Sequence, residues 1–94
     1  MTKEDELMNF LTTKVFGPIL DSPNASRELK SGIHLTMGRL RQRDAKGMIQ
    51  YYWSCLADET AIRFSKEIKR EHFTRFEDVM EEFRDRFNDD WLRQ

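Results

Sequence analysis

Residues 47–64 read GMIQYYWSCLADETAIRF and place two tyrosines and a tryptophan next to one another. Consecutive residues of a helix are about 100° apart around its axis, so Tyr51, Tyr52 and Trp53 point in three different directions and cannot form one stacking platform. We expect Trp53 to face the interior of the protein. It belongs to an apolar stripe with helical spacing, made of Ala45, Ile49, Trp53, Ala57, Phe64 and Ile68.

A second apolar surface on the same helix predicts self-association. Its members are Met48, Tyr51, Cys55 and Ile62. We expect the helix to run unbroken from Asp44 to about Glu71, a length of ~40 Å that three helices of ordinary size cover only in part. The uncovered surface therefore predicts a two-fold homodimer.

Two alternatives stay open for this region. In the first, the second apolar surface packs on the N-terminal helix and the protein is a monomer. In the second, the segment ADET, residues 57–60, divides the long helix in two, with Asp58 as the N-cap of the second piece.

The N-terminal residues predict a first helix. Thr2 resembles the start of a capping box, and Gly17 with Pro18 is expected to end the helix near Phe16, because proline lacks a backbone donor. The apolar positions of this helix are Leu7, Met8, Leu11 and Val15.

A second helix is expected to open at Pro23 or Asn24. Its main apolar stripe is Leu29, Ile33, Met37 and Leu40, and a second face of mostly small residues is Ser31, Leu35, Gly38 and Gln42. Gly32 and Gly38 each cost about 1 kcal/mol relative to alanine inside a helix. Such a cost is often accepted where another backbone must come close, so we expect this helix to be contacted on two sides. Alternatively, the helix kinks or ends near Gly38.

The C-terminal residues predict a fourth helix and complete the architecture. Thr74 and Glu77 form a capping box, followed by one apolar face made of Phe76, Val79, Met80, Phe83, Phe87 and Trp91. No segment alternates polar with β-branched residues as a strand does. We therefore expect an all-α protein in which residues 1–94 form a single domain, a four-helix bundle with a long central third helix.

The composition limits the classes of function. The chain is 38% hydrophobic and 35% charged with a net charge of −1, so it is a globular domain without a global field for nucleic acid or anionic membranes. The N-terminus is acidic where a signal peptide is basic, and no apolar run is long enough to span a bilayer. One cysteine excludes an internal disulfide. These features predict a cytoplasmic protein that does not enter the membrane.

Signals for catalysis are weak. His34 and His72 lie on different predicted helices, and neither has ligands at metal-binding spacing around it. Cys55 has no basic neighbours in sequence that activate a thiol. No phosphate-binding loop or nucleophile motif occurs. We expect no catalytic residues, no metal and no cofactor.

The clearest local charge pattern is basic. Six Lys or Arg and only two acids lie between Arg27 and Lys46. Together with one histidine they form a basic strip on and after the second helix: Arg27, Lys30, His34, Arg39, Arg41, Arg43 and Lys46. The strip could bind phosphates. Three alternatives stay open: the cations stabilise the dipole at the end of the helix, they are simply solvated, or they pair with the acidic face of the fourth helix within the chain or across a dimer.

The segment RFEDVMEEFRDRF, residues 75–87, resembles the closing helix of retroelement capsid domains. The resemblance covers about a dozen residues and is shared by amphipathic helices rich in Phe, Glu and Arg, so it implies no function for this chain. We expect a non-enzymatic adaptor, regulator or accessory subunit that works by self-association and protein–protein interaction with an unknown partner. The alternatives are a nucleic-acid-associated protein that uses the basic strip and, third, an enzyme with an unrecognised site.

Overall fold

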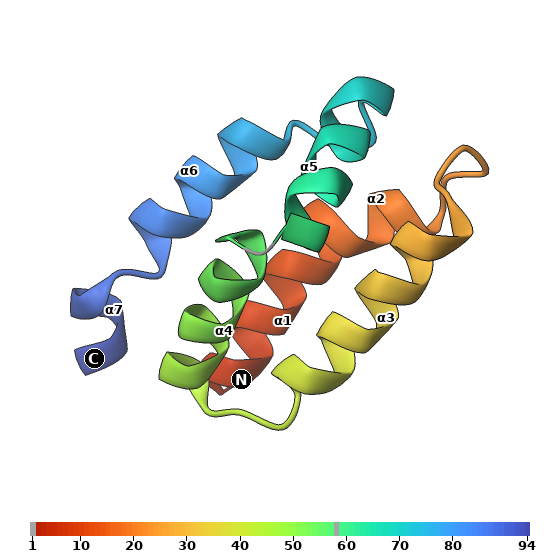
Figure 1. Ribbon diagram of the computed structural model, residues 1–94. Coiled ribbons are helices and arrows are strands. Elements are labelled where there is room, and N and C mark those ends of the chain that lie inside the picture. Colours follow the sequence, from red (N-terminus) through yellow and green to blue (C-terminus); the bar gives the residue numbers. More distant parts are fainter. Residues whose placement is uncertain (1, 58) are drawn as a thin grey trace.

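The computed structural model describes residues 2–57 and 59–94, without the side chains of residues 59–61. Throughout this part of the chain the only regular structure is helical, which confirms the all-α prediction. The elements are α1 (Lys3–Leu11), a π-helical segment (Thr12–Phe16), α2 (Gly17–Leu20), α3 (Arg27–Leu40), α4 (Ala45–Ala57), α5 (Glu59–Glu71), α6 (Phe76–Arg86) and α7 (Asp89–Arg93) (Figure 1). None of the helices in the described residues is both long and apolar enough to cross a membrane.

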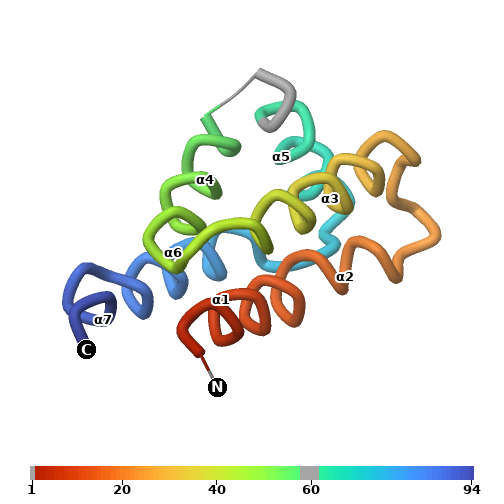
Figure 2. Tube along the Cα trace, turned by 90° about the horizontal axis from the view of Figure 1, so that it is seen from below, coloured from red at the N-terminus to blue at the C-terminus, as the bar shows by residue number. Residues whose placement is uncertain are grey.

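The N-terminal helix does not stop at Phe16 as the sequence predicts. Figure 2 shows that α1, the π-helical segment and α2 follow one another along one rod. The backbone N–H of Gly17 donates to the carbonyl of Thr12, five residues earlier. Pro18 has no N–H for the carbonyl of Lys14, four residues before it, and the hydroxyl of Thr74 donates to that carbonyl at 2.7 Å. A contact 60 residues away along the chain therefore accommodates the proline.

The bond to Lys14 also changes the start of α6. The sequence predicts that Thr74 caps this helix together with Glu77, but the hydroxyl of Thr74 is directed at the N-terminal rod. Arg75 occupies the N-cap position without a side-chain cap. The predicted apolar face is nevertheless confirmed, because Phe76, Val79, Phe83 and Phe87 are buried while Met80 and Trp91 are partly buried against the core.

Helix α3 begins later than expected and is tied to α5. Its N-cap is Ser26, whose hydroxyl accepts from the N–H of Leu29 at 3.1 Å. The N–H and hydroxyl of Ser26 both donate to the carboxylate of Glu67, at 2.9 and 2.8 Å. Charged partners strengthen such bonds, so Glu67 fixes α5 against the start of α3.

The two faces of α3 have different surroundings. The main stripe is confirmed, with Leu29, Ile33 and Leu40 buried and Met37 partly buried. A Cβ atom on Gly32 would lie 2.7 Å from the ring of Phe64, so the absence of a side chain there lets α5 approach. The predicted second face, Ser31, Leu35, Gly38 and Gln42, is exposed instead of covered. The helix continues through Gly38 to Leu40.

The predicted long third helix is two helices, α4 and α5, which contact one another and run in different directions (Figures 1 and 2). The prediction of one unbroken helix is therefore wrong, and the alternative that divides this helix near residues 57–60 is confirmed. Asp58 and the capping role predicted for it lie outside the described residues.

Of the three consecutive aromatic residues of α4, Tyr52 is the one buried in the core, at 2% exposed, whereas Trp53 is 37% exposed. The prediction that Trp53 faces the interior holds only in part, because its ring packs 5.7 Å from that of Phe83 but lies at the edge of the core, and the buried positions of α4 are Ala45, Met48 and Tyr52. Tyr52 packs in a cluster of aromatic rings centred on Phe83. The prediction for Ala45 and Ile68 is confirmed.

The two chain ends lie close together. Asn88 caps α7 by accepting from the N–H of Trp91 at 2.9 Å. From α1, the ammonium of Lys3 donates to the carbonyls of Trp91 and Gln94 at 2.9 and 2.6 Å. Lys3 thus donates to carbonyls of the last turn of α7, where the carbonyl of Trp91 also accepts from the N–H of Gln94.

Candidate functional site

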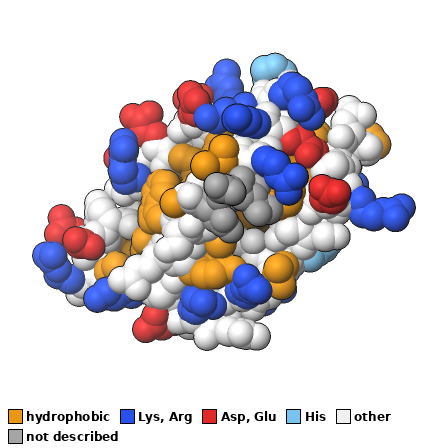
Figure 3. Space-filling model, viewed as in Figure 1, with side chains coloured by type: hydrophobic (Ala, Val, Ile, Leu, Met, Phe, Trp, Pro, Cys, Tyr) orange, Lys and Arg blue, Asp and Glu red, His pale blue; other side chains and the backbone are white. Residues whose placement is uncertain are grey.

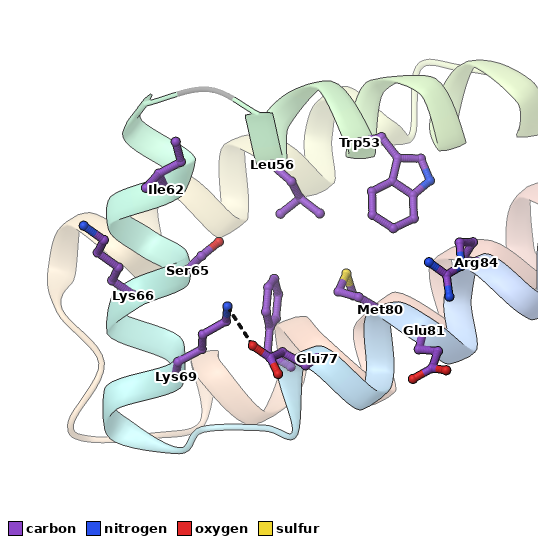
Figure 4. A pocket seen from close by; sticks show the side chains of 11 residues that line it. Trp53, Leu56, Ile62, Ser65, Lys66, Lys69, Glu77, Met80, Glu81 and Arg84 are labelled. Carbon is purple, nitrogen blue, oxygen red and sulfur yellow. Dashed lines mark ion pairs between the residues drawn. The ribbon is translucent and has the colours of Figure 1, made fainter.

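A groove of about 630 Å³ lies between the end of α4, one side of α5 and one side of α6; we call it the α4–α5–α6 groove (Figure 4). Its lining residues are Trp53, Leu56, Ile62, Ser65, Lys66, Lys69, Phe76, Glu77, Met80, Glu81 and Arg84. The break between α4 and α5 creates this site, because it turns α5 away from the line of α4. The groove is of a size that takes side chains of a partner.

Apolar side chains make up much of the groove. Trp53 and Ile62 are 37% and 45% exposed, and Leu56 and Met80 are half-buried beside them. Figure 3 shows hydrophobic side chains gathered on this face between α4 and α6, bordered by charged ones. Large apolar residues left open together mark a binding surface more often than isolated ones do. Methionine adapts readily to the shape of a partner.

Charged side chains line both walls of the groove. Lys66 and Lys69 stand on α5, whereas the α6 wall carries Glu77 and Glu81 together with Arg84 (Figure 4). Lys69 pairs with Glu77 across the groove at 3.1 Å. No ion pair joins Lys66 or Glu81 to another described side chain, so these two charges are available to a partner.

The four residues predicted as a self-interface do not share one surface. Met48 is 1% exposed and belongs to the core, where α4 packs on α1, so its predicted place in an interface is corrected. Tyr51 and Cys55 are half-buried. Only Ile62 lies in the α4–α5–α6 groove. Because α4 is rotated by one residue relative to the prediction, Met48 turns inward and Trp53 turns outward.

Tyr51 is covered by the basic strip. The guanidinium of Arg39 donates to its hydroxyl at 3.2 Å, and that of Arg43 lies 4.2 Å from the centre of its ring. Burial raises the pKa of Tyr51, and the hydrogen bond from Arg39 opposes the rise. The same bond raises the pKa of Arg39. Tyr51 therefore organises two arginines at the end of α3.

The basic strip lies on α3 and on the connection to α4. Lys30 is half-buried, and the other members are exposed: Arg27, His34, Arg39, Arg41, Arg43 and Lys46. Within the described residues none of these side chains forms an ion pair with a carboxylate. The expected pairing with the acidic side of the C-terminal helix inside one chain is therefore absent from this part of the structure.

The described side chains contain no group of three His, Cys, Asp or Glu residues placed to hold a metal ion. His34 is exposed on α3 and Cys55 is half-buried on α4. Burial raises the pKa of Tyr52, whose hydroxyl donates only to the thioether sulfur of Met80 at 3.3 Å. A buried phenol with an apolar environment stays protonated and serves packing.

Sequence reasoning misses most of the groove. It assigns Trp53 to the interior and Leu56 to neither face. The sequence signal that could have indicated the groove is the ADET segment. If the helix breaks there, the positions of Trp53 and Ile62 no longer follow from the period of one continuous helix. Comparison with known protein families, characterised proteins and solved structures finds no match to this chain.

Proposed function

We propose that this protein is a cytoplasmic, non-enzymatic interaction module that acts as an adaptor, regulator or accessory subunit. Its working surface is the α4–α5–α6 groove, which takes the apolar face of an amphipathic helix from a protein partner. The observation that carries the proposal is the exposure of Trp53 and Ile62 together above an apolar groove of about 630 Å³. The free, half-buried thiol of Cys55 suits a reducing compartment.

The walls of the groove define the chemistry of the helix it accepts. Apolar side chains such as Leu and Phe fill the space beside Leu56 and Met80. Acidic residues on one flank of the helix face Lys66, and basic residues on the other flank face Glu81. Such complementary charges orient a helix and fix its direction more than they add affinity.

A designed peptide with this pattern tests the proposal. We expect a fluorescently labelled helical peptide with a Leu/Phe stripe and these two flanks to bind with a dissociation constant on the order of micromolar, as seen by anisotropy. Ile62→Asp places a charge in the apolar contact and weakens binding by about tenfold or more. Leu35→Asp changes an exposed apolar residue on α3, outside the groove, and leaves binding unaltered.

The peptide experiment has two outcomes that contradict the proposal. One is equal binding of a peptide with the same composition and a scrambled stripe. The other is an equal effect of the Ile62 and Leu35 substitutions, which are 45% and 55% exposed in the wild type. Both changes lie on the surface, so circular dichroism is expected to show unchanged helix content.

The basic strip supports a second candidate function, association with nucleic acid. Arg39, Arg41 and Arg43 are exposed without a carboxylate partner among the described residues. Binding to duplex DNA or RNA is expected to fall steeply with salt and to be lost when these three arginines become glutamate, measured by electrophoretic mobility shift. Absence of wild-type binding at low salt removes this candidate.

A further inference from the structure

The charges on the groove walls are arranged so that the groove complements itself. A two-fold interface brings the same surface of two copies together, so each contact between residue i of one copy and residue j of the other occurs a second time with the copies exchanged. Such a surface needs basic and acidic groups on opposite sides of the axis. Lys66 on α5 and Glu81 on α6 meet this requirement, since Figure 4 shows them on opposite walls.

The apolar residues follow the same arrangement. Figure 4 shows Ile62 toward one end of the groove and Trp53 toward the other, with Leu56 between them. A two-fold axis that crosses the groove midway between these two residues, perpendicular to the line that joins them, therefore brings Ile62 of a second copy to Trp53 of the first copy. Both side chains are more than one-third exposed in the single chain, so this contact removes apolar surface from water twice.

The remaining groove charges have neighbours of opposite charge within the chain. Lys69 and Glu77 neutralise one another within the chain at 3.1 Å. Arg84 lies 3.8 Å from its neighbour Asp85. Among the groove charges, Lys66 and Glu81 are the two for which the described side chains provide no ion-pair partner.

We infer that the occupant of the α4–α5–α6 groove is a second copy of this chain, placed by a two-fold axis so that Lys66 of each copy pairs with Glu81 of the other. This inference rests on the proposed function, because it names an occupant of the same groove; the second copy presents its own α5 and α6 there in place of a separate helix. It differs from the interface expected from the sequence, which included Met48 of the core.

Sedimentation equilibrium of the full chain with charge-reversed variants tests the inference. We expect the wild type to dimerise reversibly at micromolar concentration. Lys66→Glu and Glu81→Lys each replace two attractive contacts by two repulsive ones and raise the dissociation constant about tenfold or more at low salt. An equimolar mixture of the two variants regains dimers of wild-type affinity, because the mixed dimer contains one wild-type pair and one pair in which the two charges are exchanged.

A matched control separates this effect from a change in net charge. Lys46→Glu alters the charge by the same amount on the basic strip, outside the groove, and is expected to leave dimerisation unchanged. Lys66 and Glu81 are exposed, and thermal denaturation of their variants is expected to match the wild type. The designed peptide occupies the same groove and therefore dissociates the wild-type dimer.

The outcomes distinguish this inference from the proposed function. A wild-type monomer at about 100 micromolar that still binds the designed peptide overturns the second copy and keeps the groove as a docking site. A dimer that survives both reversals, or whose variants do not recover on mixing, overturns the Lys66–Glu81 arrangement. A chain that neither dimerises nor binds the peptide overturns both proposals.

Discussion

Replacing Phe83 with alanine is expected to lower the free energy of unfolding by about 3–5 kcal/mol, which is a large part of the ~5–14 kcal/mol typical for a domain of this length. Phe83 is 1% exposed and its ring lies within 6 Å of four others. The partner rings come from α1, α4 and the end of α6: Phe10, Tyr52, Trp53 and Phe87. Removal of the central ring leaves a cavity that rigid neighbours cannot close.

Urea denaturation followed by far-ultraviolet circular dichroism measures the loss. Phe73→Ala serves as the control, because it removes the same ring from a half-buried position at the edge of the core. We expect the control to cost less than half as much, since less apolar surface is buried there. Equal losses for Phe73 and Phe83 would show that the aromatic cluster is not the centre of the core.

The parts of the fold that depend on local sequence were predictable. Thr2 caps α1 by accepting from the N–H of Asp5 at 3.0 Å, as its spacing predicts. The apolar stripes of α3 and α6 are buried at the expected positions, because a stripe within one helix needs only the helical period. All-helical architecture follows from the same periodicity.

The orientation of α4 was not predictable once continuity was assumed. An unbroken helix must place Phe64 and Ile68 on the same face as residues of α4, and this requirement selects the stripe that contains Trp53. Because α4 ends at Ala57, the spacing of its own apolar residues determines which face is buried, and Tyr52 lies on that face. The wrong helix boundary therefore assigned Trp53 to the interior, and the prediction missed the groove in which this residue lies.

Two further differences come from contacts between distant segments. The hydroxyl of Thr74 reaches the carbonyl of Lys14, which the sequence around Pro18 leaves without a donor. No local pattern links residues 60 positions apart, so both the continued N-terminal helix and the missing cap of α6 required the structure. The groove is likewise a tertiary feature, formed by three helices.

The stability of the protein is expected to fall above about pH 10, where an unfolded tyrosine ionises, because Tyr52 is buried in the folded state. Burial raises the pKa of its phenol above the unfolded value, so the folded state holds this proton more tightly than the unfolded state does. The stabilisation is complete below the unfolded pKa and is lost progressively as the pH rises toward the folded pKa. The loss is about 1.4 kcal/mol per pH unit, or roughly 2 kcal/mol near pH 11.5.

Tyr52→Phe isolates this contribution from the other groups that titrate at high pH. The hydroxyl donates only to the thioether of Met80 at 3.3 Å, a weak acceptor, so we expect the variant to match the wild type within about 1 kcal/mol at pH 7. Near pH 11.5 the variant should be the more stable protein by roughly 2 kcal/mol relative to that baseline, as measured by urea denaturation at each pH. Parallel pH profiles for the two proteins would mean that the Tyr52 phenolate reaches water in the folded state, and the inward orientation of α4 that exposes Trp53 to the groove would then be wrong.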